Sequence, residues 1–280
     1  MKSIPNITKD KGLSVTKNIA AKLISLGGSV SVSEKYRDYD IPAVSYYEAL
    51  PEDTELIVVV GGDGSMLDAS PLALLRDIPL LGVNLGKVGY LGEVEPDNLD
   101  SLERIFSGEY STDEKMLLSV ELFHEGGREV IERLAVNDVI LSHDSFVGIA
   151  EFVLYNSLGD SIKYRADGMI LSTPAGSTAY SLSAGGPIIS HDIDAIAATP
   201  ICPHSFFNRS IIFKPGDEIR LENKSSSPMN VSIDGRLFGK VSEGERCVVR
   251  SAEARLKVLT FSESNMFAAL FKKMKILEGI

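Results

Sequence analysis

Val58-Val59-Val60-Gly61-Gly62-Asp63-Gly64-Ser65 joins a run of branched apolar residues to a glycine-rich loop, and the architecture is predicted outward from this junction. Residues 56–60 are apolar throughout and lie between polar residues and glycines, which is typical of a strand buried on both faces. Residues 79–83 form a second run of the same kind. Two such strands with a helical segment between them predict a βαβ unit and a parallel sheet.

The glycine-rich loop is a candidate phosphate-binding site, because glycines let backbone N–H groups approach oxyanions and a following helix adds a favourable dipole. We therefore expect Gly61, Gly62, Gly64 and Ser65 to contact nucleotide phosphates. Asp63 would repel a phosphate unless a metal screens it or it faces a hydroxyl that must lose a proton, and the latter role is general-base catalysis. The alternative is a tight turn in which Asp63 bonds its own backbone.

The rest of the chain predicts two domains. Residues 12–26 have mostly helical apolar spacing and end at Gly27-Gly28, whereas Ser70-Pro71 is expected to open a second helical segment after the loop. From residue 115 the texture changes to short β-favouring runs, among them residues 117–123, 134–141, 148–155 and 169–172. Residues 263–277 predict an amphipathic helix.

The predicted fold class is therefore an α/β N-terminal domain with a parallel sheet, residues 1–108, followed by a mainly-β, sandwich-like C-terminal domain, residues 109–261. The C-terminal helix, residues 262–280, is expected to pack back on the N-terminal domain.

Composition excludes several classes of function. The formal charge of −11 argues against a protein that mainly binds nucleic acid. No signal-peptide core and no apolar run of about 18 residues occurs, so we expect a cytoplasmic protein without a membrane span. Two cysteines, Cys202 and Cys247, make neither a disulfide framework nor a zinc site, and no metal-ligand pattern occurs among the histidines.

Gly61-Gly62-Asp63-Gly64 resembles the signature shared by NAD kinases, diacylglycerol kinase-like lipid kinases and 6-phosphofructokinases. Further motifs resemble those of NAD kinases, and they run in the family's order over most of residues 55–261. They are Asn84-Leu85-Gly86-Lys87-Val88-Gly89-Tyr90-Leu91, Val136-Asn137-Asp138, Asp167-Gly168, the glycine- and threonine-rich residues 172–186, and Thr199-Pro200-Ile201-Cys202-Pro203-His204.

The resemblance implies a role for each matching residue. Asp63 would take the proton from the 2′-hydroxyl of the adenosine ribose of NAD, or orient that hydroxyl, as it attacks the γ-phosphorus of ATP. Asn137 and Asp138 would hold the adenosine. The alternative is a turn at Asn137-Asp138, for which the flanking strand residues Val136 and Val139 leave little room. The other implied NAD-binding residues are Gly64, Tyr90, Leu91, Arg165, Asp167, Ala175, Thr178, Ala179, Tyr180 and Ser183. Arg165 could instead be a surface arginine and Tyr180 a core residue.

Two departures from the family pattern concern hydroxyl groups. Ala175 stands where many members have Thr or Ser, so any side-chain contact made there is lost; Ser65 replaces the commoner Thr and keeps its hydroxyl. Asn6 and Lys9-Asp10 could belong to a first loop that faces ATP.

The resemblance also implies Mg²⁺ or another divalent metal with ATP, no nucleic-acid or membrane partner, and a homo-oligomer, commonly a tetramer or dimer. In the oligomer, the acidic turn at Asp234 would lie near the nucleotide of a neighbouring subunit. Two alternatives stay open: a diacylglycerol kinase-like lipid kinase, which would need an apolar cleft, and a non-catalytic NAD(P)-binding regulator, which would not need Asp63.

Overall fold

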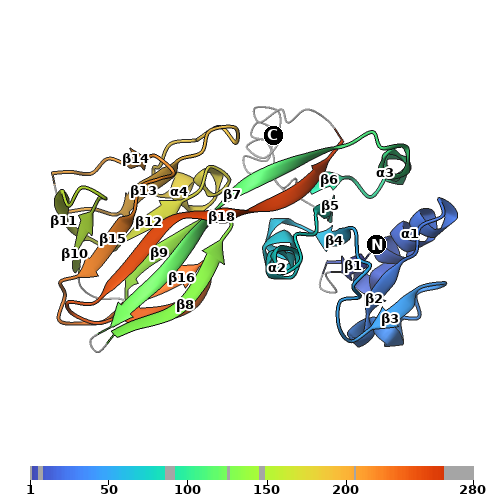
Figure 1. Ribbon diagram of the computed structural model, residues 1–280, viewed down its shortest axis with the longest axis horizontal. Coiled ribbons are helices and arrows are strands. Elements are labelled where there is room, and N and C mark those ends of the chain that lie inside the picture. Colours follow the sequence, from blue (N-terminus) through green and yellow to red (C-terminus); the bar gives the residue numbers. More distant parts are fainter. Residues whose placement is uncertain are drawn as a thin grey trace. The chain divides into compact units, whose positions relative to one another are not determined.

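The computed structural model describes residues 2–5, 9–85, 92–124, 127–144, 149–204 and 206–261. The chain forms two compact units, a first unit of Met1–Glu114 with Leu256–Ile280 and a second unit of Lys115–Arg255 (Figure 1). The predicted C-terminal helix, Tyr90 and Leu91 lie outside the described residues.

The first unit contains a parallel sheet, as the sequence predicted. Its described strands run in the order β6-β5-β4-β1-β2-β3, and every neighbouring pair is parallel. The strands are β1 (Lys2–Pro5), β2 (Ser31–Ser33), β3 (Ser45–Tyr47), β4 (Ile57–Gly61), β5 (Leu80–Asn84) and β6 (Gly92–Val94). The strand order reverses between β1 and β4, which in doubly wound sheets is the point where ligands bind.

Helices accompany this sheet, and Figure 1 draws α1 and α2 flanking β1 and β4. Val58 and Val60 on β4 belong to one hydrophobic cluster with Ile19 and Leu23 of α1, so alternation along the strand turns Ile57 and Val59 to the other face. The α-helices are α1 (Ser14–Ser25), α2 (Asp63–Leu74) and α3 (Glu103–Ser107), with 3₁₀ helices η1 (Lys11–Leu13), η2 (Glu34–Tyr39) and η3 (Leu99–Leu102).

Both ends of α1 have identifiable causes. Asp10 accepts hydrogen bonds from the backbone N–H groups of Val15 and Thr16, at 3.0 and 2.8 Å, and so satisfies donors that the first turn leaves unpaired. Gly27 adopts φ +90° just after the helix, and Gly28 N–H bonds the Leu23 carbonyl at 2.9 Å. The predicted stop at Gly27-Gly28 is confirmed.

Helix α2 corrects one expectation, because it runs unbroken through Pro71 and no second helix opens there. Pro71 has no N–H to donate to the Leu67 carbonyl. The Ser70 hydroxyl donates to that carbonyl instead, at 2.9 Å. The Ser70 hydroxyl therefore replaces the backbone hydrogen bond that Pro71 cannot make inside the helix, and Ser70 does not act as a cap.

The second unit consists of antiparallel strands in two sheets. One sheet has the order β14-β13-β12-β9-β16-β17, and in the other the order is β11-β10-β15-β18-β7-β8. The first comprises β9 (Asp138–His143), β12 (Gly168–Ser172), β13 (Ile196–Ile201), β14 (Ile211–Phe213), β16 (Met229–Ile233) and β17 (Arg236–Val241). The second comprises β7 (Ser111–His124), β8 (Gly127–Ala135), β10 (Ala150–Tyr155), β11 (Ser161–Ala166), β15 (Ile219–Asn223) and β18 (Arg246–Thr260). A short 3₁₀ helix η4 (Gly176–Thr178) and helix α4 (Tyr180–Ser183) follow β12.

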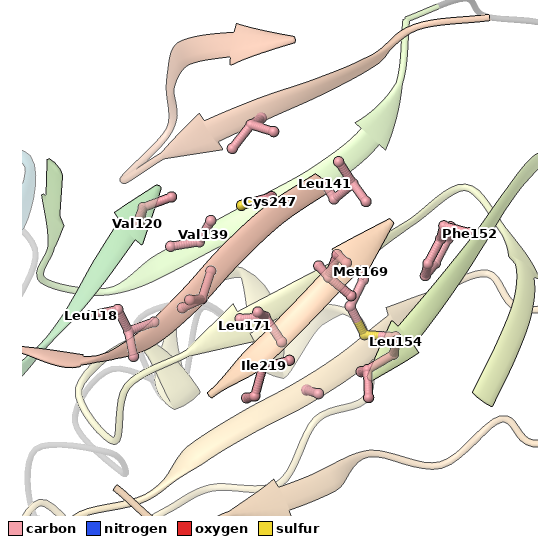
Figure 2. Packing of buried hydrophobic residues seen from close by; sticks show 14 of the residues in the cluster. Leu118, Val120, Val139, Leu141, Phe152, Leu154, Met169, Leu171, Ile219 and Cys247 are labelled. Carbon is pink, nitrogen blue, oxygen red and sulfur yellow. The ribbon is translucent and has the colours of Figure 1, made fainter. Parts of the chain in front are cut away.

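One hydrophobic core lies between these sheets, and Figure 2 shows side chains of both converging on it. Leu141 and Leu171 come from the first sheet and Leu118 and Phe152 from the second. Because side chains alternate along a strand, Asp138 and Ser172 fall on the outer face of the first sheet, away from this core. In the part of the chain that the structure describes, no helix is long and apolar enough to cross a membrane.

Candidate active site

The glycine-rich loop lies at the switch point of the parallel sheet. β4 ends at Gly61, Gly62 is the N-cap of α2, and Asp63 is the first helical residue. The Gly61 carbonyl accepts a hydrogen bond from Leu85 N–H at 2.8 Å, which joins the ends of β4 and β5. The sheet thus presents the start of α2 at its carboxyl edge.

The N-terminus of α2 differs from that of α1 in the groups that lie beside its first backbone N–H groups. The Gly62 carbonyl accepts from Ser65 N–H at 2.8 Å, but glycine has no side chain with which to cap the helix. A Cβ atom added to Gly62 would lie 3.0 Å from Lys9 Nζ, so an ammonium group lies directly against the loop. A helix N-terminus next to a cation favours an anion such as phosphate.

Asn137 and Asp138 lie at a bend that we did not expect. The sequence predicted one continuous strand over residues 134–141, but β8 ends at Ala135 and β9 begins at Asp138, with Val136 and Asn137 in a bend between them. The argument that flanking valines leave no room for a turn was therefore wrong, because tertiary hydrogen bonds hold this bend.

One set of these bonds comes from the turn that follows β12. Thr173 Oγ1 donates to the Val136 carbonyl at 2.7 Å, and Thr173 N–H donates to the Asn137 carbonyl at 2.9 Å. A Cβ atom added to Gly176 would lie 1.9 Å from the Asn137 carbonyl oxygen, so only glycine fits there. The structure therefore packs the Asn-Asp motif against the start of the glycine- and threonine-rich stretch.

The other set comes from Asp234, in the turn between β16 and β17. Its carboxylate accepts from the backbone N–H groups of Val136, Asn137 and Asp138 at 2.9, 2.8 and 3.1 Å. Sequence analysis assigned no role in its own chain to this residue; the available signal was an Asp-Gly turn between two strands.

The electrostatics around Asp138 are unusual. The residue is 4% exposed, and burial together with the nearby carboxylate of Asp234 raises the pKa of Asp138 to about 7. Burial also raises the pKa of Asp234, while its three N–H partners oppose that rise. A buried carboxyl whose pKa lies near neutrality is characteristic of a functional site.

The remaining expected NAD-binding residues of the second unit lie around η4 and on β11. Ala175 and Thr178 are buried, and Thr178 Oγ1 donates to the Ala175 carbonyl at 3.1 Å. Tyr180 is 46% exposed, so it is not a core residue, and Ser183 is exposed beside it on α4.

Arg165 and Asp167 have partners on neighbouring strands. Arg165 is exposed and its Nε lies 3.3 Å from a Glu151 carboxylate oxygen. Asp167 lies with a carboxylate oxygen 3.8 Å from His143 Nε2. Both charges are therefore at the surface of the second unit and accessible to a ligand.

Two further observations bear on ligands. A cavity of about 320 Å³ in the second unit is lined by His143, Glu151, Lys224 and neighbouring residues, and none of the expected site residues that the structure describes contributes to it. Among the residues that the structure describes, no group of three or more His, Cys, Asp or Glu side chains could hold a metal ion.

A doubly wound unit with a carboxylate in the glycine-rich loop at its switch point, together with an antiparallel unit that carries a buried acidic bend, has the features expected of a nucleotide-dependent phosphotransferase. Two family models refine this class: the ATP-NAD kinase N-terminal domain matches residues 15–110, and the ATP-NAD kinase C-terminal domain matches residues 136–261. The NAD kinase of Caldanaerobacter subterraneus subsp. tengcongensis is 35% identical over 280 residues and 97% of each chain. That of Geotalea daltonii is 36% identical over 228 residues, 81% of this chain and 80% of its own.

Solved structures agree on the fold. A yeast NADH kinase complexed with NADH superposes with a TM-score of 0.85 at 22% identity, covering 98% of this chain and 86% of its own. An NAD kinase from Archaeoglobus fulgidus in complex with ATP gives a TM-score of 0.73 at 22% identity, covering 98% of both chains. The chain belongs to the ATP-NAD kinase family. It is an enzyme with NAD kinase activity, and the lipid-kinase and regulator alternatives are set aside.

Proposed function

We propose that Asp63 is the catalytic base of a transfer in which the 2′-hydroxyl of the adenosine ribose of NAD attacks the γ-phosphorus of ATP. The new O–P bond gives NADP, the bond to the β-phosphate oxygen breaks to release ADP, and the hydroxyl proton passes to Asp63. The proposal rests on the position of Asp63, whose carboxylate lies on the first residue of α2 at the switch point of the sheet. Phosphoryl transfer needs mainly alignment and charge screening, which such a position provides.

The ATP phosphates are proposed to bind the backbone around Gly61, Gly62, Gly64 and Ser65. Support comes from the glycine N-cap and from the Lys9 ammonium beside it. A divalent metal such as Mg²⁺ would be held mainly by the phosphates and by water, which fits a described site with one loop carboxylate and no cage of protein ligands. When bound, it would neutralise charge on the transferring group.

NAD is proposed to bind the second unit. Asn137 would read the adenine edge and Asp138 would accept from a ribose hydroxyl, and the bonds that hold their backbone support this assignment. Thr178, Ala179, Tyr180 and Ser183 would line the dinucleotide, with Ala175 contributing through its backbone. Arg165 would pair with a phosphate, and Asp167 would accept from the nicotinamide-side group. Gly64, Tyr90 and Leu91 are further proposed NAD-binding residues, each implied by the resemblance to NAD kinases.

We also propose that the protein is a cytoplasmic homo-oligomer, because the resemblance to NAD kinases implies assembly. Size-exclusion chromatography with light scattering tests this proposal directly. A monomer at all concentrations would contradict it.

The catalytic assignment is tested by incubating the protein with NAD, ATP and Mg²⁺ and coupling NADP to an NADP-specific dehydrogenase. Asp63→Asn keeps the shape of the side chain but cannot accept the proton, so kcat should fall by about 10²- to 10⁴-fold with NAD binding retained. Asp68→Asn is the matched control, since it removes the same charge from the exposed face of the same helix. Full kcat in Asp63→Asn would refute the base role.

A further inference from the structure

Asp234 occupies a turn in which two consecutive residues have a left-handed backbone. It joins β16 to β17 with φ +48°, and Gly235 follows with φ +78°. Left-handed backbone at both central positions is the pattern of the tight hairpin turn that Asp-Gly favours. The turn alone does not require the carboxylate to leave solvent, yet both of its oxygens are engaged with another segment.

Those oxygens accept hydrogen bonds from three consecutive backbone N–H groups. Val136 N–H bonds one oxygen at 2.9 Å, and the N–H groups of Asn137 and Asp138 bond the other at 2.8 and 3.1 Å. Asp234 N–H returns a bond to the Asp138 carbonyl at 3.0 Å. Four bonds from one residue fix the bend at the start of β9, because successive N–H groups that converge on one anion define the backbone between them.

The same contact places the carboxylates of Asp138 and Asp234 near each other in a buried environment. Asp138 is 4% exposed, and no hydrogen bond to its carboxylate is found among the residues that the structure describes. Among the described residues, Asp234 from the hairpin turn acts on its charge, and Ser172 lies opposite Asp138 on the neighbouring strand β12 with a buried hydroxyl for which no hydrogen-bond partner is found there. Arg236, on β17, acts on Asp234. If Asp234 served only to stabilise the bend, the buried carboxyl of Asp138, without a hydrogen-bond partner among the described residues, would add nothing to that stability.

We propose that Asp234 is a positioning residue for NAD: through its three backbone bonds it holds Asn137 and Asp138 in the arrangement that binds the adenosine. The inference rests on the proposed NAD-binding role of that pair. Of the two carboxyls Asp234 ionises first, because it alone has N–H donors. Asp138 then ionises against that charge, and ribose hydroxyls supply the donors that the unliganded bend lacks. Binding of NAD therefore favours ionised Asp138 and strengthens as pH rises toward and through about 7.

Two variants separate the backbone role from the charge. Asp234→Asn keeps an oxygen for the N–H groups of Asn137 and Asp138 and tolerates the left-handed turn, but removes the negative charge. Asp234→Ala removes the three side-chain bonds to the bend and keeps only the backbone bond to the Asp138 carbonyl. Asp160→Asn, which takes a charge from the exposed β10–β11 turn of the same unit, is the matched control.

The readouts are KM for NAD, KM for ATP, kcat and the pH profile of KM for NAD, with folding checked by thermal unfolding. Asp234→Ala should raise KM for NAD by about 10- to 100-fold, the range expected when charge-assisted bonds are lost, and leave KM for ATP within about twofold. Asp234→Asn should raise it less and shift the midpoint of the pH profile to lower pH.

An unchanged KM for NAD and an unchanged pH midpoint in folded Asp234→Asn would overturn the proposal. The proposed function fails differently: if Asn137→Ala and Asp138→Asn leave KM for NAD unchanged, the pair does not bind NAD. If those variants raise KM and the Asp234 variants do not, only the positioning role is wrong.

Discussion

Asp138→Asn should make the unliganded protein more stable at alkaline pH while weakening NAD binding. In the folded state the pKa of Asp138 is raised from 3.8 to about 7, since the charged form is buried beside Asp234. Between these two pH values the folded state holds a proton that the unfolded state has released. The stability of the wild type therefore falls as pH rises from about 4 to about 7, and above that the loss is complete.

The magnitude follows from the distance between the two pKa values. A shift from 3.8 to about 7 at about 1.4 kcal/mol per unit corresponds to about 4 kcal/mol of stability. Little solvent screening applies, because the residue is 4% exposed. Asparagine has nearly the same shape, cannot ionise, and offers an N–H₂ donor to the Asp234 carboxylate, so the variant avoids this loss.

The assay is urea unfolding of both proteins without nucleotide at about pH 5 and about pH 8. Other titrating groups act equally in both proteins. Subtracting the change in unfolding free energy of the variant from that of the wild type therefore isolates the contribution of Asp138. We expect the wild type to lose about 2.7 kcal/mol more than the variant between the two conditions, because only the two pH units between 5 and about 7 fall inside this interval. Equal losses in both proteins would refute the buried, charge-coupled state of Asp138.

The remaining predictions concern single contacts and are checked by thermal unfolding together with KM for NAD. Gly176→Ala forces a Cβ atom against the Asn137 carbonyl and should cost more than about 3 kcal/mol or raise KM for NAD at least tenfold; a variant with normal stability and KM would contradict the packing. Asp10→Ala removes the N-terminal bonds of α1 and should cost about 2 kcal/mol. Ser70→Ala leaves the Leu67 carbonyl without its donor and should cost about 1 kcal/mol; no change in either variant would show that water replaces the lost bond.

The local pattern of the sequence was sufficient for the central strands of the first unit and for the end of α1. Branched apolar runs around residues 56–60 and 79–83 predicted the parallel pair β4 and β5, which the structure confirms with Ile57 opposite Leu80. Gly27-Gly28 predicted the end of α1, and Gly27 follows the helix with a left-handed backbone that glycine adopts readily. These features succeed because their causes lie within a few residues of chain.

The two failures had different causes, one local and one distant in the chain. Pro71 predicted a break, but a serine hydroxyl one residue earlier replaces the missing donor. Val136 and Val139 predicted a continuous strand, whereas Asp234, far along the chain, holds the bend between them. No local propensity records such a partner, and this is why the site-forming bend was the hardest element to predict.

Strands β7 and β18 each cross the boundary between the units, which falls after Glu114 and after Arg255. The second unit is therefore inserted within the chain of the first, and Leu259 and Phe261 return to the first unit's core. On the ribosome the N-terminal unit cannot complete its core when its own first segment emerges; it must wait until residue 261 has been synthesised. The second unit, continuous in the chain, can fold before the first is complete.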